Sequence, residues 1–184
     1  SVLIDAINDN IPSEVSQSIK KIRYRSLNLV ILFLNKESFT SNASLYFADK
    51  NIPFTRIYEP KNRSKYMAPD GQTCIVVEIP FDESDISNKN INVESQIHIS
   101  KVKSFLINKG FIDSDEILDC KVVRMPYAYP ILDINSSRYT ARAFKYLDTI
   151  ENLHLIGRNT EFKYLHVHDL FKKSKRKIYE IKNT

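Results

Sequence analysis

Runs of apolar residues divide the chain into strand-length stretches separated by polar loops. Residues 28–35 (NLVILFLN) form a continuous apolar run, which is typical of a strand buried on both faces. Three further runs rich in β-branched and aromatic residues follow at 43–49, 54–60 and 73–80. Because Asn, Pro and Gly residues punctuate these runs, we expect a strand at each of the four places.

Other stretches repeat their apolar residues with helical spacing or have the length and end signals of helices. The expected helices cover residues 2–9, 13–22, 94–109, 138–150 and 167–182. Ser13 is the expected N-cap of the second helix, and Gly110 is placed to end the third in a left-handed conformation. The apolar stripes comprise Ile97, Val102, Phe105 and Leu106 in the third helix, Phe144, Leu147 and Ile150 in the fourth, and Val167, Leu170, Phe171, Ser174, Ile178 and Ile181 in the last.

The second half of the chain adds two expected strands. Residues 115–131 (DEILDCKVVRMPYAYPI) have the composition of a strand that is stopped by Pro126 and Pro130. Residues 153–157 (LHLIG) form one more short apolar run. The pattern as a whole predicts an α+β domain, with a mixed, largely antiparallel sheet and helices packed on it.

Composition narrows the class of protein. The chain has 184 residues with 42% hydrophobic and 27% charged residues, a globular balance, and no run approaches the roughly 20 apolar residues that span a bilayer. Cys74 and Cys120 supply neither a disulfide framework nor zinc spacing, so we expect a cytoplasmic protein. Because Ser1 runs straight into an apolar pattern, we expect the chain to be cut from a longer protein.

The formal net charge is +5, and the excess is concentrated in the last helix. The cluster consists of Lys172, Lys173, Lys175, Arg176 and Lys177. Such a cluster fits nucleic acid, an acidic lipid surface or a phosphorylated ligand, and it also fits an ordinary solvated helix face. No nucleic-acid-binding motif accompanies it, so we do not expect a nucleic-acid partner.

One glycine is followed by an arginine where a strand is expected to lead into a helix. Backbone N–H groups and the positive end of the helix dipole would face an anion there, and Gly157 would allow close approach. Arg158 could fork onto a phosphate or a carboxylate. The alternative is an ordinary strand-to-helix turn.

Two further clusters offer weaker candidates. His166, His168 and Asp169 could contact a metal, a phosphorylated ligand or a neighbouring carboxylate, although their spacing is not that of a helical metal-binding pair. Tyr127 and Tyr129 lie between two prolines, where rigid phenols could line a pocket or pack in the core. The sequence contains no nucleophile elbow, Walker loop or Gly-x-Gly-x-x-Gly loop.

Three stretches resemble flavoproteins. Residues 53–80 (PFTRIYEPKNRSKYMAPDGQTCIVVEIP) resemble the middle of the FAD-dependent amine oxidase and protoporphyrinogen oxidase-like proteins. Residues 127–133 (YAYPILD) and 152–171 (NLHLIGRNTEFKYLHVHDLF) are similar to the C-terminal end of the same superfamily, above all to UDP-galactopyranose mutases. Thr160 departs from that family, which usually has Ala or Gly at this position of the motif.

The resemblance implies FAD as cofactor of the full-length parent, with weak or no binding by this chain alone. The positions implied to lie beside the flavin are Gly157, Arg158, Asn159, Phe162, Tyr164 and His168. Those implied for the substrate are Tyr127, Tyr129, Arg56 and Arg124, with Arg63 as a further candidate to grip a diphosphate. It implies neither a catalytic residue nor a metal.

The resemblance also implies two domains with different functions. Residues 1–150 would form a substrate-binding domain, and residues 151–184 would supply the last strand and helix of a Rossmann FAD domain whose N-terminal half is absent. We expect first an FAD-dependent oxidoreductase of the amine oxidase-like superfamily acting on a small molecule. The second expectation is a nucleotide-sugar mutase of cell-surface polysaccharide biosynthesis. A non-catalytic interaction domain, which would self-associate through an exposed apolar face, or a basic nucleic-acid-binding module remains the alternative.

Overall fold

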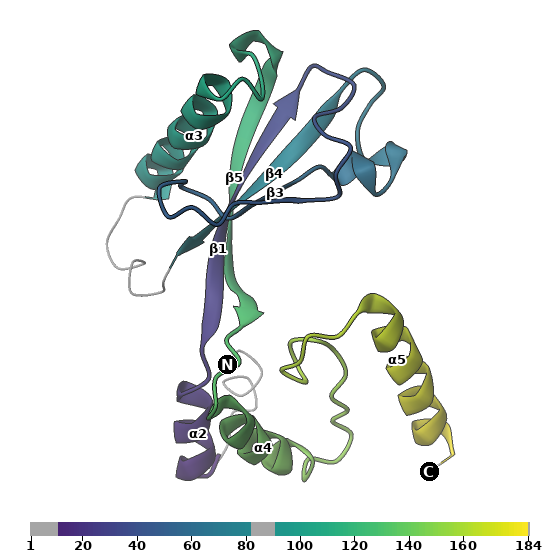
Figure 1. The fold of residues 1–184 in the computed structure, drawn as a ribbon. Coiled ribbons are helices and arrows are strands. Elements are labelled where there is room, and N and C mark those ends of the chain that lie inside the picture. The colour runs from purple at the N-terminus through teal and green to yellow at the C-terminus, as the bar shows by residue number, and fades with distance from the viewer. Residues whose placement is uncertain (1–10, 82–90, 184) are drawn as a thin grey trace. The chain divides into compact units, whose positions relative to one another are not determined.

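The computed structural model describes residues 11–81 and 91–183, without the side chains of residues 91 and 92 (Figure 1). The chain forms two compact units. We call residues 25–128 the sheet unit, and the described parts of residues 1–24 and 129–184 the helical unit. The predicted functional boundary at residue 150 does not coincide with a boundary between these units and stays a prediction. The helix predicted at residues 2–9 lies outside the described residues.

An antiparallel sheet of five strands forms around the long apolar runs (Figure 1). The strands are β1 (Tyr24–Leu34), β2 (Leu45–Tyr46), β3 (Arg56–Tyr58), β4 (Thr73–Phe81) and β5 (Ile117–Pro130), in the spatial order β2-β3-β4-β1-β5. β1 pairs with β4 along its length, from Ser26 opposite Phe81 to Leu34 opposite Thr73. The α+β class is confirmed, and β2 and β3 are shorter than the apolar runs that predicted them.

One face of this sheet is covered by helix α3 (Ile91–Asn108). Alternate residues of β1 and β4 meet Val102 and Leu106 of this helix in a core whose central side chains are fully buried. The strand residues of the core are Val30, Leu32, Leu34, Ile75, Val77 and Ile79. Ile97 was expected on the buried stripe, but its side chain is 47% exposed, and Ile99 is buried instead. The stripe therefore lies farther round the helix than the sequence pattern indicates.

Gly110 ends α3 as predicted. Its φ angle is +69°, and its N–H donates to the carbonyl of Ile107 while the N–H of Phe111 donates to that of Leu106. These two bonds form a Schellman motif, which requires a left-handed residue at the position of Gly110.

Strand β5 continues through Pro126, which was expected to stop it. A proline removes one N–H from a ladder, and this loss disrupts a central strand. β5 is the edge strand beside β1, so one of its two sides needs no partner. The prediction that Pro126 ends the strand was therefore wrong, while Pro130 is its last residue.

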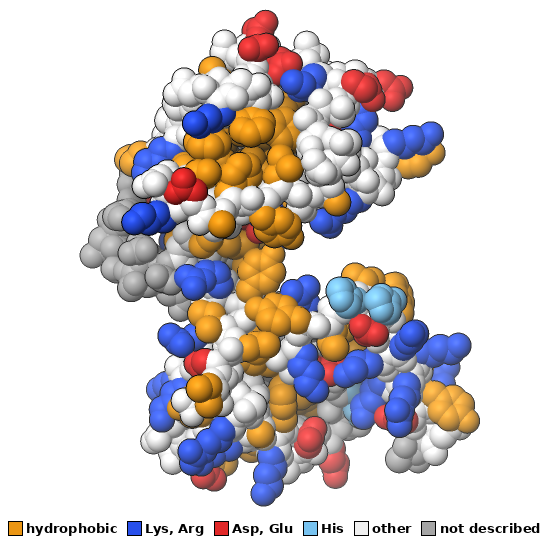
Figure 2. All heavy atoms as spheres, in the orientation of Figure 1, with side chains coloured by type: hydrophobic (Ala, Val, Ile, Leu, Met, Phe, Trp, Pro, Cys, Tyr) orange, Lys and Arg blue, Asp and Glu red, His pale blue; other side chains and the backbone are white. Residues whose placement is uncertain are grey.

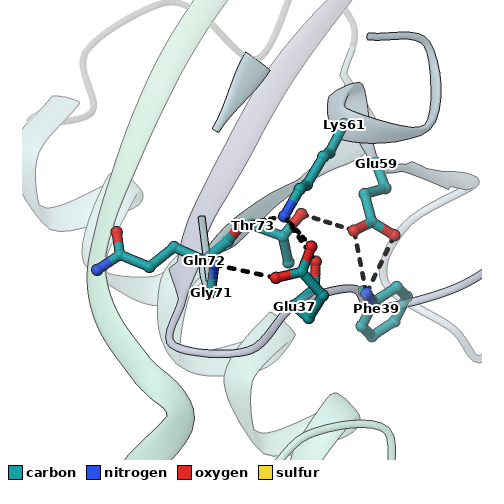
Figure 3. Close-up of polar contacts among 7 residues, drawn as sticks. All are labelled: Glu37, Phe39, Glu59, Lys61, Gly71, Gln72 and Thr73. Atoms are coloured by element: carbon teal, nitrogen blue, oxygen red, sulfur yellow. Dashed lines mark hydrogen bonds and ion pairs between the residues drawn. The ribbon is translucent and has the colours of Figure 1, made fainter. Parts of the chain in front are cut away.

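A buried carboxylate holds the polar segment between β3 and β4 in place through hydrogen bonds (Figure 3). It contains two short 3-10 turns, η1 (Pro60–Asn62) and η2 (Lys65–Met67), where a loop was expected. The fully buried carboxylate of Glu59 accepts hydrogen bonds from the backbone N–H of Phe39 and Thr40 and from the hydroxyl of Thr73 at 2.6 Å. These bonds join the loop after β1 to the start of β4, because one carboxylate accepts from both.

Helices α2 (Ser13–Lys20) and α4 (Ser136–Leu147) pack against each other in the helical unit. Val15 of α2 and Ala143 and Leu147 of α4 are buried. Ser13 is the first helical residue and not the N-cap, because Pro12 occupies that position and no side chain caps the helix. A proline with extended ψ can precede a helix, but it has no side-chain oxygen to accept a hydrogen bond from the first free N–H groups of the helix.

The end of the chain differs from its prediction in two ways. Residues 153–157 form no strand, since no other described strand pairs with them. Helix α5 (Val167–Lys182) forms where expected, but none of its residues is buried. The side chains of Val167 and Phe171 are 69% and 73% exposed, so the expectation that Phe171 lies in a core was wrong. Figure 2 shows Lys and Arg side chains beside exposed apolar ones on the helical unit.

Candidate functional site

The segment from Gly157 to Tyr164 is a compact turn and not a strand-to-helix junction. The N–H of Glu161 donates to the carbonyl of Gly157 at 2.8 Å, and the N–H of Lys163 donates to that of Arg158 at 3.1 Å. Gly157 has a φ angle of +132°, which only glycine adopts readily. Helix α5 begins at Val167, where it was expected, so Gly157 lies in a separate turn and the free N–H groups of the helix N-terminus are not beside it in sequence.

This turn brings Arg158 close to the rings of two tyrosines. Its guanidinium lies 5.1 Å from the ring centroid of Tyr164 and 5.9 Å from that of Tyr129. The hydroxyl of Tyr164 donates to the carbonyl of Pro130 at 2.7 Å, which fixes the turn to the end of β5. Three residues singled out from separate stretches of sequence therefore form one cluster, which we call the arginine clamp (Tyr129, Arg158 and Tyr164).

Phe162 supports the arginine clamp from inside. Its side chain is 7% exposed and meets the ring of Tyr24 edge-on, with the centroids 5.5 Å apart. Burial raises the pKa of Tyr24, so this phenol stays protonated at neutral pH. The backbone of Phe162 has a φ angle of +51°, an unusual conformation for a side chain of this size. Asn159 is exposed on the same turn.

The histidines lie at the start of α5. The rings of His166 and His168 are stacked, with centroids 5.5 Å apart and planes 5° from parallel, and Nε2 of His168 is 3.5 Å from Oδ1 of Asp169. His166 and Asp169 cap the helix reciprocally. Among the residues that the structure describes, no group of three or more His, Cys, Asp or Glu side chains could hold a metal ion.

A second cluster occupies the sheet face that α3 does not cover. Arg56 of β3 is directly opposite Glu78 of β4, and their side chains form an ion pair. The guanidinium of Arg56 also lies 5.9 Å from the ring centroid of Tyr46 and 5.1 Å from that of Tyr58. The guanidinium of Arg63 also approaches Tyr58, at 5.4 Å from its ring centroid. We call Tyr46, Arg56, Tyr58 and Glu78 the sheet-face cluster.

Arg124 lies on the opposite face, among side chains of α3. Its guanidinium is 4.5 Å from the ring centroid of Phe81, and its Nη1 is 3.8 Å from Oε2 of Glu94. His98 joins the same group, since its Nε2 is 3.4 Å from Oε1 of Glu94, and Nδ2 of Asn28 lies 3.1 Å from the same nitrogen. The structure thus separates Arg124 from Arg56, although the sequence proposed both for substrate.

The remaining predicted position is Tyr127, which is 52% exposed with a φ angle of +59°. It belongs to the sheet unit, while Tyr129 belongs to the helical unit. The two tyrosines between the prolines therefore have different surroundings.

Sequence reasoning assigned no role to Glu78, Tyr46 or Tyr58. Tyr46 of β2 and Glu78 of β4 reach Arg56 only through the register of β2, β3 and β4, whereas Tyr58 is two residues from Arg56 on β3. A charged residue within the apolar run of β4 was the one available signal, because a carboxylate inside a buried strand needs a partner.

Cys74 is a poor candidate for a nucleophile. Burial raises the pKa of its thiol, and the nearby Glu59 carboxylate raises it further. The thiolate is therefore scarce at neutral pH. Across residues 11–81 and 91–183, no helix combines the length and apolar character needed to cross a membrane.

A sequence model of the family "GLF: UDP-galactopyranose mutase" matches residues 10–105, which are 96 of the 184 residues. The chain belongs to the UDP-galactopyranose mutase family. The matched range includes Arg56 and Glu78 and ends before the arginine clamp. No curated protein matches the chain.

Two solved structures share the fold. A reduced UDP-galactopyranose mutase has a TM-score of 0.66 at 18% identity over 80% of this chain. A proposed protoporphyrinogen oxidase from Exiguobacterium sp. 255-15 has a TM-score of 0.58 at 11% identity over 78% of it. The chain spans 31% and 32% of their lengths, so it corresponds to about a third of each protein.

Proposed function

We propose that the chain is the substrate-binding and C-terminal part of an FAD-dependent mutase that acts on a UDP-sugar. The observation that carries the proposal is membership of the UDP-galactopyranose mutase family over residues 10–105. Of the two enzymatic expectations from the sequence, the family match favours the mutase.

The arginine clamp has a donor set that fits the anionic part of FAD. Arg158 is half-buried against two rings, an arrangement that orients its planar guanidinium. A guanidinium forks onto phosphate oxygens, and stacked rings favour a planar cofactor. We therefore assign Gly157, Arg158, Asn159, Tyr164 and His168 to cofactor binding, with Phe162 as their buried support.

The sheet-face cluster fits the substrate in the same way. Arg56 and Arg63 can donate to a diphosphate, and the exposed ring of Tyr46 can stack on a planar or sugar ring. Tyr127 and Tyr129 remain candidates for the substrate. Arg124 is the weakest candidate, since it packs under α3.

When bound, FAD would supply the redox-active ring that a mutase of this kind needs. The residues of this chain would bind and orient: arginines would hold phosphate oxygens, and tyrosine rings would exclude water. Positioning of this sort lowers the entropic part of a barrier. No residue of the chain is assigned as the catalytic base.

An oxidoreductase of the amine oxidase-like superfamily is the second candidate. The fold shared with the proposed protoporphyrinogen oxidase supports it. The two candidates differ in product, because a mutase returns an isomer of its substrate whereas an oxidase returns an oxidised product.

The test is to purify the protein encoded by the complete reading frame, record its visible spectrum and incubate it with UDP-galactopyranose and a reductant. We expect flavin absorption bands and an isomeric UDP-sugar resolved by chromatography. Absence of flavin after reconstitution with FAD would overturn the proposal. An Arg158→Ala variant should lose flavin, while Arg176→Ala, on the surface of α5, should retain it.

A further inference from the structure

Glu78 is an unusual residue for its place in the fold. It lies within the apolar strand β4, its side chain is 9% exposed, and its neighbours Val77 and Ile79 point into the core under α3. Since side chains alternate along a strand, Glu78 points to the uncovered face. Its carbonyl accepts from the N–H of Thr55 at 3.0 Å, which fixes the strand beside it.

The partner of Glu78 is fixed on several sides. Arg56 is opposite Glu78 in the β3–β4 register, and its guanidinium lies 5.9 Å from the ring centroid of Tyr46 and 5.1 Å from that of Tyr58. The Arg56 side chain is only 22% exposed. Because a free arginine loses much rotamer entropy when it binds, an arginine that is already held binds its ligand at a lower entropic cost.

Charge alone predicts that Glu78 weakens the binding of an anion, which is the opposite of what an orienting role predicts. A carboxylate beside Arg56 lowers the positive potential, so by charge alone it weakens binding of an anion. A residue that only neutralised charge would therefore improve anion binding when replaced by glutamine. A residue that orients the guanidinium would impair it. The two roles therefore predict opposite changes in anion affinity when Glu78 is replaced by glutamine.

We propose that Glu78 is a positioning residue, which holds Arg56 in the orientation that receives an anionic oxygen of the substrate. This inference rests on the proposed function, namely that the sheet unit binds a UDP-sugar. The rings of Tyr46 and Tyr58 add contacts that restrict the guanidinium further. Glu78 itself touches no ligand and acts through Arg56.

The experiment uses the 184-residue chain and two readouts. The first is the NMR signal of the Arg56 Nε–H group, which is sharp and slow to exchange when the guanidinium is held. The second is the dissociation constant for UDP from calorimetric titration. We compare the wild type with Glu78→Gln and Arg56→Lys, and Glu37→Gln serves as a control that removes a different ion pair, that with Lys61.

We expect Glu78→Gln to broaden the Arg56 signal and to weaken UDP binding about tenfold, a typical cost of losing a charge-assisted contact. Arg56→Lys keeps the charge but loses the fork, and it should weaken binding similarly. Glu37→Gln should change neither readout. If Glu78→Gln fails to fold, Arg56→Lys still tests whether orientation matters.

Two outcomes overturn the inference and are distinguishable from each other. Unchanged or tighter UDP binding in Glu78→Gln, or unchanged binding in Arg56→Lys, means that Glu78 does not act by orientation. A wild-type chain with a sharp Arg56 signal and no UDP binding means instead that the proposed substrate is wrong.

Discussion

The sheet unit and helix α5 of the helical unit bury their apolar residues to very different degrees. Val30, Leu32, Ile75, Val77 and Leu106 of the sheet unit are completely buried. In the helical unit, α5 has an apolar stripe and no buried residue. The apolar residues of the sheet unit are thus buried within the unit, whereas the apolar stripe of α5 is not buried. The comparison indicates that the sheet unit is stable on its own, whereas α5 depends on a surface beyond its unit.

The largest difference is expected for a pair of truncations. Leu106→Ala removes a fully buried side chain of α3 and should lower the free energy of unfolding by about 2–5 kcal/mol. Phe171→Ala removes a side chain of α5 that is 73% exposed and should change it by less than about 0.5 kcal/mol. Urea denaturation followed by circular dichroism measures both. Equal losses would show that the α5 face is covered in solution.

The next largest effect is expected at the buried carboxylate of the sheet unit. Glu59→Gln places an NH₂ group where the Phe39 N–H and the Thr73 hydroxyl now donate to the carboxylate (Figure 3). The N–H of Thr40 donates to the same carboxylate. The loss should be about 3 kcal/mol, because charge-assisted bonds are broken and buried donors lose their acceptor. Glu37→Gln, at an exposed carboxylate in the same region, should cost clearly less. Similar unfolding midpoints for the two variants would contradict this account of Glu59.

A smaller effect is expected in the helical unit. Tyr164→Phe keeps the ring beside Arg158 but removes the hydroxyl that donates to Pro130 at 2.7 Å. One such bond contributes about 0.5–1.5 kcal/mol, so the free energy of unfolding should fall by about that amount. Thermal denaturation measures it, with Tyr179→Phe on exposed α5 as the control. No difference between the variants would mean that the hydroxyl is solvated.

The smallest effect is the pH dependence from ion pairs that lie at or near the surface. A hydrogen bond from Lys61 lowers the pKa of Glu37, and one from Lys36 lowers that of Glu116. A hydrogen bond from Arg23 lowers the pKa of Asp133 in the helical unit. A lowered folded-state pKa stabilises the protein above the ordinary value, which is 4.5 for Glu and 3.8 for Asp, and this contribution is lost as the pH falls through the folded value.

Stability should therefore decrease as the pH is lowered from about 5 to 3, modestly because solvent screens such pairs. Urea midpoints across this range measure the decrease. Glu37→Gln and Glu116→Gln together should reduce the slope in the sheet unit, and Asp133→Asn should reduce it in the helical unit. A slope that these replacements leave unchanged would assign the acid sensitivity to other groups.

The sheet unit could be predicted well because its signals are local. The run at 28–35 is too apolar to lie anywhere but in a buried strand, and Gly110 ends its helix through a backbone angle that other residues avoid. The run at 153–157 has similar composition but forms no strand. A strand also needs a neighbour, and composition does not reveal whether one exists.

The candidate sites were predictable in part. Tyr129, Arg158 and Tyr164 were each singled out, and a resemblance implied their roles, but their mutual contact depends on a turn that the sequence pattern misplaced. Glu78 was not predicted as a partner of Arg56, because cross-strand register depends on the turns that join the strands. The sequence therefore indicated individual residues that could bind a ligand, but it did not indicate which residues distant in sequence are in contact.

Hydrogen–deuterium exchange along the chain tests the contrast between the two units most directly. We predict that amides of β1 and β4, in residues 26–34 and 73–81, exchange only on global unfolding, whereas those of α5, in residues 167–182, exchange orders of magnitude faster. Equal protection of α5 and the β1–β4 pair would contradict the account, because it would show that the helical unit needs no further surface to become ordered.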